Sequence, residues 1–294
     1  MALEAGVIGL GNIGGGVARN LAAAGHSVIG YDIDTDLISA RGVREAEDSA
    51  EVAENADLVV LAVNTMPAWR STLAAIAATG RRGLVVADLC TFPIEDKATA
   101  HEELRRVGIS LLDCPVSGAR PQADAGELAM LVSGDMDAFE RVKPALESFC
   151  RTVTHVGAFG TSSKIKYIIN LIISIENLAC AEAFLLARKA GVDLRQMADA
   201  VMDSAAHSKI FGIRAEKWIS GDYTDPTAEL AIQLKDKDIV RDFAASVNAP
   251  TPLFDATMPY YIAAASQGRT REDAASILAV LEAMAGIPRD PETP

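Results

Sequence analysis

The sequence has few of the features that mark several large classes of protein. Its four cysteines, Cys90, Cys114, Cys150 and Cys180, lie far apart and form no CxxC pair. We therefore expect reduced and mostly buried thiols in a cytoplasmic protein. Basic residues are also scarce, since 27 Lys and Arg against 40 Asp and Glu give a formal net charge of -13. This balance argues against nucleic acid or an anionic membrane as a partner.

Targeting and membrane signals are weak as well. The N-terminus, MALEAGVIGLG, has an acid where a signal peptide carries basic residues. The most apolar stretch, YIINLIISIENLACAEAFLLA, includes the polar residues Asn170, Glu176, Asn177 and Glu182, so we do not expect a membrane span. We predict no metal site, and the tail PRDPETP is typical of a disordered end.

What the sequence does contain is an alternation of short apolar runs with helix-length stretches over residues 5–160. The strand-like runs are AGVIGL, SVIGYD, LVVLAV, LVVAD and ISLLDC, and the helical stretches are 12–24, 34–41, 67–78 and 93–107. Near-continuous apolar strands between helices predict a parallel sheet with both faces covered. LAMLVSG and TVTHVG predict further strands around a helix at 136–149.

Strand signals stop after Gly160. Residues 161–190 predict one long helix, with Thr161 or Ser162 as its N-cap and Gly191 at its end. Residues 193–285 are helical in pattern, with breaks at GDYTDP, at NAPTP and near Gly268. The chain therefore predicts an α/β Rossmann-type domain over 1–160 and an all-α domain over 161–294.

A dinucleotide-binding motif opens the first domain. Gly9, Gly11 and Gly14 form G-x-G-x-x-G directly after a strand and at the start of a helix. The glycines permit a tight turn and close approach of a pyrophosphate, whose charge the helix N-terminus favours. Asp32 ends the second strand, where its carboxylate would accept from ribose hydroxyls and disfavour a 2′-phosphate, so NAD is expected rather than NADP. The alternative is a glycine turn without a ligand.

Four segments in order resemble the β-hydroxyacid dehydrogenases, the family of 3-hydroxyisobutyrate and tartronate semialdehyde dehydrogenases related to 6-phosphogluconate dehydrogenase. They are GLGNIG at 9–14, DCPVSGARPQADAGELAMLVSGD at 113–135, GAFGTSSKIKYIIN at 157–170 and QLKDKD at 233–238. The resemblance covers nearly the whole chain. It implies two domains, a nicotinamide cofactor, oxidoreduction at a hydroxyl β to an acid group, and a homodimer or homotetramer.

The resemblance also implies which residues line the cofactor. Lys235 would close over the nicotinamide from the helical domain, although a charge on a solvated face is an equal interpretation. Val63-Asn64 departs from the usual Leu-Pro of the family. The full cofactor-binding set is Gly9, Leu10, Gly11, Asn12, Ile13, Gly14, Asp32, Val63, Asn64, Thr91 and Lys235.

Two lysines, Lys164 and Lys166, compete for the catalytic role. The family has its lysine nine residues after the glycine at 157 and an asparagine four residues later, which selects Lys166 and Asn170. Helix geometry agrees, because residues four apart share a face and residues two apart do not. A partly desolvated lysine can exchange the hydroxyl proton while hydride moves to the nicotinamide. Lys164 is expected to reach solvent.

The predicted substrate contacts come from two segments. Ser117 and Gly118 follow Pro115 in a loop and would hold the acid group through a hydroxyl and a backbone N–H, unless they form only a turn. Arg120 stands beyond Ala119, where the family repeats glycine, and would clamp a small anionic substrate unless it faces solvent. Ser174 lies on the helical stripe of Lys166 and Asn170.

Two other functions stay open at this point. Imine reductases share the fold but typically lack a lysine at the position of Lys166. A non-catalytic dinucleotide-binding module is a second class, and Lys166, Asn170 and Ser117 argue against it. The main prediction is an NAD-dependent 3-hydroxyacid dehydrogenase or semialdehyde reductase.

Overall fold

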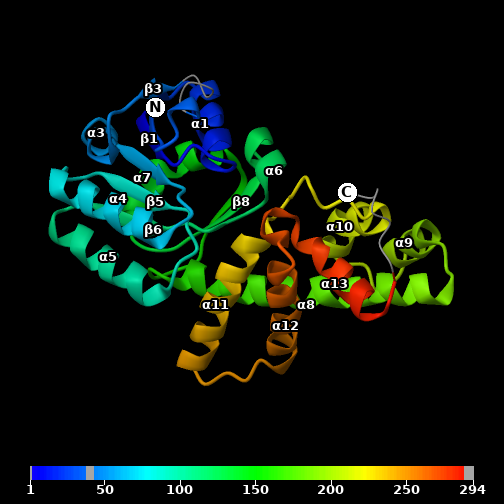
Figure 1. The fold of residues 1–294 in the computed structure, drawn as a ribbon. Helices are drawn as coiled ribbons and strands as arrows, with labels where there is room; N and C mark the ends of the chain where they lie inside the picture. Colours follow the sequence, from blue (N-terminus) through cyan, green and yellow to red (C-terminus); the bar gives the residue numbers. More distant parts are fainter. Residues whose placement is uncertain (1, 38–42, 288–294) are drawn as a thin grey trace. The chain divides into compact units, whose positions relative to one another are not determined.

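The computed structural model describes residues 2–37 and 43–287, and Figure 1 shows its helices and strands. The chain divides into two compact units, Met1–Lys166 and Tyr167–Pro294. The division falls inside the helix that we expected to open the second domain, rather than at 160. The tail PRDPETP and residues 38–41 of the helix expected at 34–41 lie outside the described residues.

The first unit is built on a parallel sheet of six strands. These are β1 (Glu4–Ile8), β2 (Ser27–Tyr31), β3 (Arg44–Glu45), β4 (Leu58–Leu61), β5 (Val85–Asp88) and β6 (Ser110–Asp113). Their order in the sheet is β3-β2-β1-β4-β5-β6. β2 and β3 are added on one side of β1 and the next three strands of the chain on its other side, so the strand order reverses between β1 and β4. This is the doubly wound arrangement of dinucleotide-binding domains, and it confirms the predicted fold class.

Both faces of this sheet are covered, which explains why its strands are apolar throughout. Val60 packs on the side of α1 (Gly14–Ala23) and α7 (Met136–Glu147). Its neighbour Val59 packs on the side of α3 (Ser49–Glu54), α4 (Met66–Thr79) and α5 (Ile94–Arg106). The short β3 and α3 had not been predicted, because neither is long enough to show a period.

A smaller sheet follows in the same unit, made of β7 (Val116–Ser117), β8 (Leu128–Val132) and β9 (Cys150–His155). Between β7 and β8 lies α6 (Arg120–Ala125), where the sequence had been interpreted as a loop. Pro121 suits the first turn of a helix, and Gly126 in the left-handed conformation ends it. Arg120 is therefore the first residue of a short helix.

The second unit is helical over its described residues. α8 (Thr161–Ala190) enters it and is followed by α9 (Leu194–Met202), α10 (Lys209–Ser220), α11 (Leu230–Ser246), α12 (Pro252–Ser266) and α13 (Ile277–Met284), with short 3₁₀ turns at Arg269–Arg271 and Ala274–Ser276. Phe184, Phe211 and Trp218 pack together in its core. The all-α prediction is confirmed for these residues.

Gly191 ends α8 as expected. Its φ is +68°, its N–H donates to the Arg188 carbonyl, and the Val192 N–H donates to the Ala187 carbonyl. This pair of bonds is a Schellman motif, which a residue with a Cβ would strain.

By length and composition alone, α8 could cross a membrane. Its polar side chains, however, have partners inside the protein. Asn177 donates to the Tyr261 hydroxyl and the Ala274 carbonyl and accepts from the buried Arg214 guanidinium. These hydrogen bonds satisfy the polar groups of Asn177 within the helical unit.

The four cysteines are free thiols, three of them buried and Cys180 partly so, which confirms the predicted state. Burial raises the pKa of the Cys150 thiol to about 12 and that of Cys180 to about 11. Both thiols are therefore protonated at neutral pH.

Candidate active site

The carboxyl edge of the six-stranded sheet collects the predicted cofactor residues. Strand pairing places the last residues of five strands in one row: Tyr31, Ile8, Leu61, Asp88 and Asp113. The glycine turn follows β1, Asp32 follows β2, Val63 and Asn64 follow β4, and Thr91 follows β5. In open α/β sheets, ligands bind at this edge, where the strand order reverses.

The glycine turn has the geometry that a dinucleotide requires. Gly9 has a φ of +88°, and a Cβ on Gly14 would lie 1.8 Å from the Gly9 carbonyl oxygen. These two glycines are thus demanded by the turn itself. A Cβ on Gly11 would meet no heavy atom within 4 Å, which leaves open space beside the start of α1 for a pyrophosphate. Around them, Leu10 is buried, Ile13 is half-buried and Asn12 is exposed.

Asp32 is held in place by the backbone. One carboxylate oxygen accepts from the Leu10 N–H at 2.6 Å, and the other accepts from the Asp34 N–H at 3.0 Å. The carboxylate therefore stands beside the glycine turn with a fixed orientation. This is the position at which a carboxylate accepts from ribose hydroxyls.

The remaining residues predicted to bind the cofactor are divided between the two units. Val63 and Thr91 are half-buried and Asn64 is exposed, each in the loop after its strand. Lys235 lies on α11 of the second unit, where its ammonium is 3.0 Å from the Asp236 carboxylate and its side chain is 34% exposed. It is therefore neither a fully solvated charge nor a buried one.

The predicted substrate segment belongs to the smaller sheet. Ser117 pairs with Ala129 at the end of β7, and Gly118 has a φ of +136°, which favours glycine. The Arg120 side chain is 62% exposed, and its guanidinium lies 3.6 Å from the Asp124 carboxylate on the next turn of α6. A bound anion would have to compete with Asp124 for this arginine.

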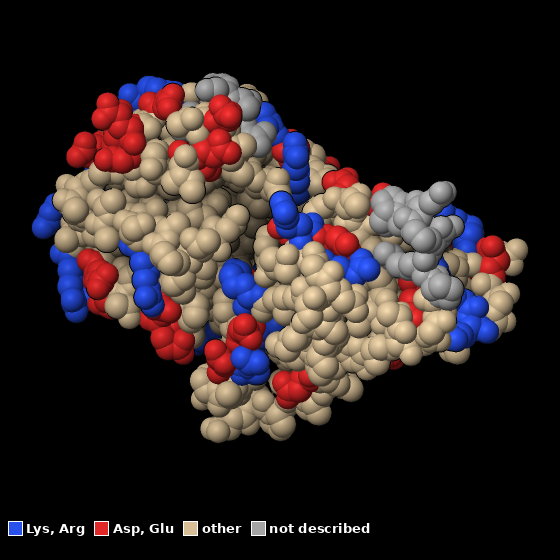
Figure 2. Space-filling view, in the orientation of Figure 1, with Lys and Arg blue, Asp and Glu red and all other residues tan. Residues whose placement is uncertain are grey.

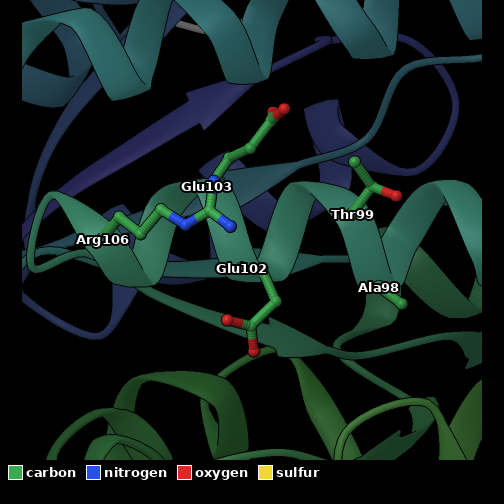
Figure 3. Close-up of a pocket in the computed structure, with 5 residues that line it drawn as sticks. All are labelled: Ala98, Thr99, Glu102, Glu103 and Arg106. Atoms are coloured by element: carbon green, nitrogen blue, oxygen red, sulfur yellow. The ribbon is translucent and has the colours of Figure 1, made fainter.

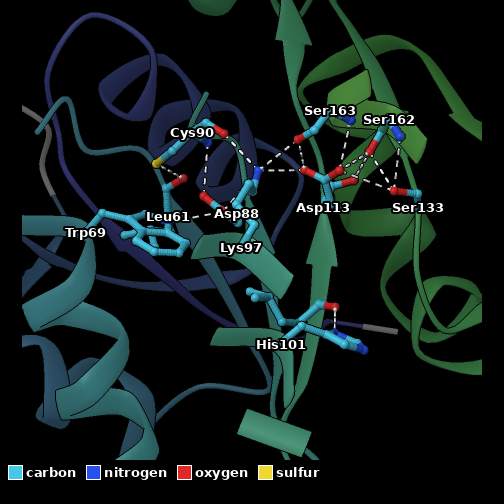
Figure 4. A network of polar contacts seen from close by, with 11 residues as sticks. Leu61, Trp69, Asp88, Cys90, Lys97, His101, Asp113, Ser133, Ser162 and Ser163 are labelled. Atoms are coloured by element: carbon cyan, nitrogen blue, oxygen red, sulfur yellow. Dashed lines mark hydrogen bonds and ion pairs between the residues drawn. The ribbon is translucent and has the colours of Figure 1, made fainter. Parts of the chain in front are cut away.

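A fully buried ion cluster stands at the same edge of the sheet (Figure 4). The Lys97 ammonium, from α5, lies 2.5 Å from the Asp113 carboxylate and 3.2 Å from that of Asp88, and it donates to the Cys90 carbonyl at 2.9 Å. Burial alone would lower the pKa of Lys97, but the two carboxylates outweigh it and raise that pKa. Burial would raise the pKa of Asp113, yet Lys97 and several hydrogen bonds keep it lowered. Lys97 and Asp113 are therefore both charged.

Asp113 also accounts for the start of α8. The Ser163 N–H donates to the Asp113 carboxylate at 2.9 Å, and the Ser162 N–H donates to the Ser133 hydroxyl at 3.2 Å. The N–H groups of Thr161 and Lys164 donate to the carbonyls of Ala158 and Gly160. All four N–H groups of the first turn are thus paired.

The expected N-cap was therefore wrong. The hydroxyls of Thr161 and Ser162 donate, to the Ala158 carbonyl and to Asp113 respectively, and accept nothing from the helix. A carboxylate 50 residues away replaces the local cap. Local sequence cannot reveal such a partner.

The two candidate lysines differ as predicted. Lys164 is exposed, whereas Lys166, two residues later and on a different face of α8, is half-buried. One turn beyond Lys166, the Asn170 amide donates to the Asp236 carboxylate at 3.0 Å, which fixes the orientation of that amide. Ser174 is buried, and its hydroxyl donates to the Asn170 carbonyl within the helix. The observed contacts of Ser174 are thus internal to α8.

A shallow hollow on α5 lies apart from these groups (Figure 3). Its lining residues are Ala98, Thr99, Glu102, Glu103 and Arg106. Glu102 is paired with Arg105 on the helix surface, and all five lining residues come from the single helix α5.

Sequence reasoning missed Lys97, Asp113 and Asp236, although the meeting of Lys97 with two strand-end acids carried a signal. Asp88 and Asp113 end adjacent apolar strands, so two acids had to meet and needed a cation. Lys97 shares the buried stripe of α5 with Ala100 and Leu104, where an unpaired charge is costly.

Comparison with known proteins agrees with this geometry. Residues 4–157 match the NAD binding domain of 6-phosphogluconate dehydrogenase, and residues 160–281 match the NAD-binding domain of NADP-dependent 3-hydroxyisobutyrate dehydrogenase. The chain belongs to the β-hydroxyacid dehydrogenase family. It is an oxidoreductase with NAD(P)-binding domains.

Several members of the family are similar over nearly the whole chain. The L-threonate dehydrogenase of Pectobacterium atrosepticum is 31% identical over 98% of this chain and 97% of its own. The 2-hydroxy-3-oxopropionate reductase of Escherichia coli K12 is 29% identical over 96% of this chain and 98% of its own. The crystal structure of 3-hydroxyisobutyrate dehydrogenase from Salmonella typhimurium has a TM-score of 0.86 and 31% identity, covering 94% of this chain and 99% of that one.

Imine reductases share the fold alone. The structure of the enzyme from Pseudomonas sp. has a TM-score of 0.61 and 20% identity. The dehydrogenase interpretation therefore fits better than the imine reductase alternative.

Proposed function

We propose that Lys166 is the acid–base group of this oxidoreductase, and that Asn170 orients the substrate oxygen. The observation that carries the proposal is the half-buried position of Lys166 on α8, three residues beyond Ser163, which is fixed to Asp113 at the carboxyl edge of the sheet. Lys164, two residues earlier, is exposed.

The chemistry divides between the cofactor and the chain. When bound, the nicotinamide would supply the hydride acceptor for oxidation of the carbinol carbon and the hydride donor for the reverse reduction. Lys166 takes the hydroxyl proton in the first direction and returns it to the carbonyl oxygen in the second. Asp236 accepts one hydrogen of the Asn170 amide nitrogen, and the second hydrogen of that nitrogen can donate to the substrate oxygen while Lys166 exchanges the hydroxyl proton.

For the cofactor we propose NAD in preference to NADP. The Asp32 carboxylate, held by two backbone N–H groups, would accept from both ribose hydroxyls and repel a 2′-phosphate. One of the matching family models describes an NADP-dependent enzyme, so the preference must be measured with both cofactors.

For the substrate we propose a small acid whose carboxylate is held by Ser117, by the backbone N–H of Gly118 and by Arg120. The relatives named for L-threonate, 2-hydroxy-3-oxopropionate and 3-hydroxyisobutyrate define the panel to be tried. An exposed arginine beside this segment favours an acid that can form two parallel hydrogen bonds.

We further propose that the protein is a cytoplasmic homodimer or homotetramer. Large apolar side chains are exposed on the second unit, among them Ile168, Ile172, Leu186, Leu253 and Ile262. Figure 2 shows a broad uncharged area over α12, whereas acidic side chains gather over β3 and α3 of the first unit. An exposed apolar surface of this kind is typical of a subunit interface.

The test is a spectrophotometric screen with NAD and with NADP over L-threonate, 3-hydroxyisobutyrate and other short hydroxy acids, and in reverse with their semialdehydes. The expected result is turnover of a 3-hydroxy acid at a higher kcat/KM with NAD. Tight dinucleotide binding without turnover of any acid would instead support a non-catalytic module.

A further inference from the structure

One face of α5 supports the segment that leads to Lys166. A Cβ on Gly160 would lie 2.5 Å from the end of the Ile94 side chain, which shows how closely that side chain packs on the Gly160 backbone. The His101 ring stacks on Phe159 with 4.1 Å between ring centres. Lys97 lies between Ile94 and His101 on this face, so α5 contacts the segment on both sides of the cation.

The cation lies at the centre of this support. The Lys97 ammonium is 3.3 Å from the Ser163 hydroxyl, and the same hydroxyl donates to the Asp113 carboxylate at 2.7 Å. Asp113 further accepts from the Ser162 hydroxyl at 2.7 Å and from the Ser163 N–H. Two consecutive residues of α8 are thereby held by one buried ion pair.

Helix geometry carries this constraint to the catalytic position. Ser163 and Lys166 are three residues apart and so lie on one face of α8, about one turn from each other. The Trp69 indole also donates to Asp88 at 3.1 Å, which leaves the cluster little freedom to rearrange. A small change at Ser163 would therefore displace the Lys166 side chain.

We propose that Lys97 and Asp113 are positioning residues, which fix the first turn of α8 so that Lys166 reaches the reacting hydroxyl. This inference rests on the proposed role of Lys166. It assigns a catalytic consequence to a buried ion pair that contacts neither substrate nor cofactor. A misplacement of about 1 Å commonly costs on the order of a hundredfold in rate.

The mild variant Ser163→Ala tests the idea, because it removes the hydroxyl between the ion pair and α8 while both charges keep their other partners. Asp113→Asn is a second variant, which keeps the shape and removes the charge. The matched control is Ile76→Val on α4, a buried change of about the same cost in stability. Each is compared by kcat, by the dissociation constant of NADH, and by the pH at which kcat/KM for oxidation reaches half of its maximum.

The expected result for Ser163→Ala is a fall in kcat of about tenfold or more with NADH affinity unchanged. The half-maximum should also move to higher pH, because a lysine that leaves its site toward solvent keeps its proton more strongly. Ile76→Val should change neither kcat nor the pH of the half-maximum at temperatures below its melting transition.

Equal losses in Ser163→Ala and Ile76→Val, or an unchanged pH profile in Ser163→Ala and Asp113→Asn, would overturn the positioning role. Lys166→Ala is measured in the same series. If it retains full turnover, the proposed function itself fails, whereas an inactive Lys166→Ala beside a normal Ser163→Ala overturns only the positioning.

Discussion

Lys237 should destabilise the folded protein at neutral pH, and its replacement by methionine should relieve that cost. The side chain is 1% exposed, and its ammonium donates to the Thr257 hydroxyl at 2.5 Å. It lies 4.0 Å from the Tyr261 ring centre and 4.7 Å from that of Phe254. Burial lowers its pKa to about 7 from an ordinary value of 10.5.

The sign of the effect follows from proton binding. Between about pH 7 and 10.5 the unfolded chain carries the proton on this lysine and the folded chain does not, so stability rises with pH across this window. At about 1.4 kcal/mol for each pH unit, the full shift corresponds to roughly 4 kcal/mol at pH 7. Attraction of the ammonium to the two rings and the bond to Thr257 are lost in the variant. We therefore expect Lys237→Met to gain about 1–3 kcal/mol at pH 7.

The assay is urea-induced unfolding followed by tryptophan fluorescence at pH 7 and pH 9. The advantage of Lys237→Met over the unmodified protein should shrink by about 2 kcal/mol at the higher pH. The control is Lys209→Met, which removes the same charge from an exposed position on α10. A Lys237→Met variant that is less stable at pH 7, or whose difference is the same at both pH values, would refute this reasoning.

Further predictions concern the cofactor and substrate positions. Gly11→Ala should fold normally but bind NADH about tenfold more weakly or worse, because the new methyl group would occupy space that only the dinucleotide needs. Gly14→Ala should lower the melting temperature, because its Cβ would clash with the Gly9 carbonyl. Thermal unfolding measures the change in stability, and calorimetric titration measures the change in NADH affinity. Asp32→Ala should narrow the ratio of kcat/KM between NAD and NADP, and an NADP preference in the unmodified protein would contradict the assignment. Arg120→Ala should raise KM for the best acid by roughly ten- to a hundredfold, and an unchanged KM would leave the arginine as a surface partner of Asp124.

The sequence predicted those parts of the molecule that depend on local chemistry. The glycine turn, the parallel strands and the end of α8 at Gly191 each follow from backbone conformation or from the period of apolar residues. The choice of Lys166 over Lys164 followed from helix geometry, and the structure confirms the difference in exposure.

The parts that were missed depend on partners distant in the sequence. The start of α8 is capped by Asp113, and the Asn170 amide is held by Asp236, 66 residues away. Short elements such as β7 and α6 also escaped, because two to six residues show no period. A buried lysine without a carboxylate partner, as at Lys237, breaks the pattern that sequence reasoning relies on.

The central claim, that Lys166 moves the substrate proton, is tested most directly by single-turnover kinetics of Lys166→Ala and Lys164→Ala with the best substrate of the panel. Lys166→Ala should slow the chemical step by about two to four decades, with NADH affinity little changed, and added primary amines should restore part of the rate. Lys164→Ala should resemble the unmodified protein. Normal turnover in Lys166→Ala, or a loss confined to Lys164→Ala, would contradict the account.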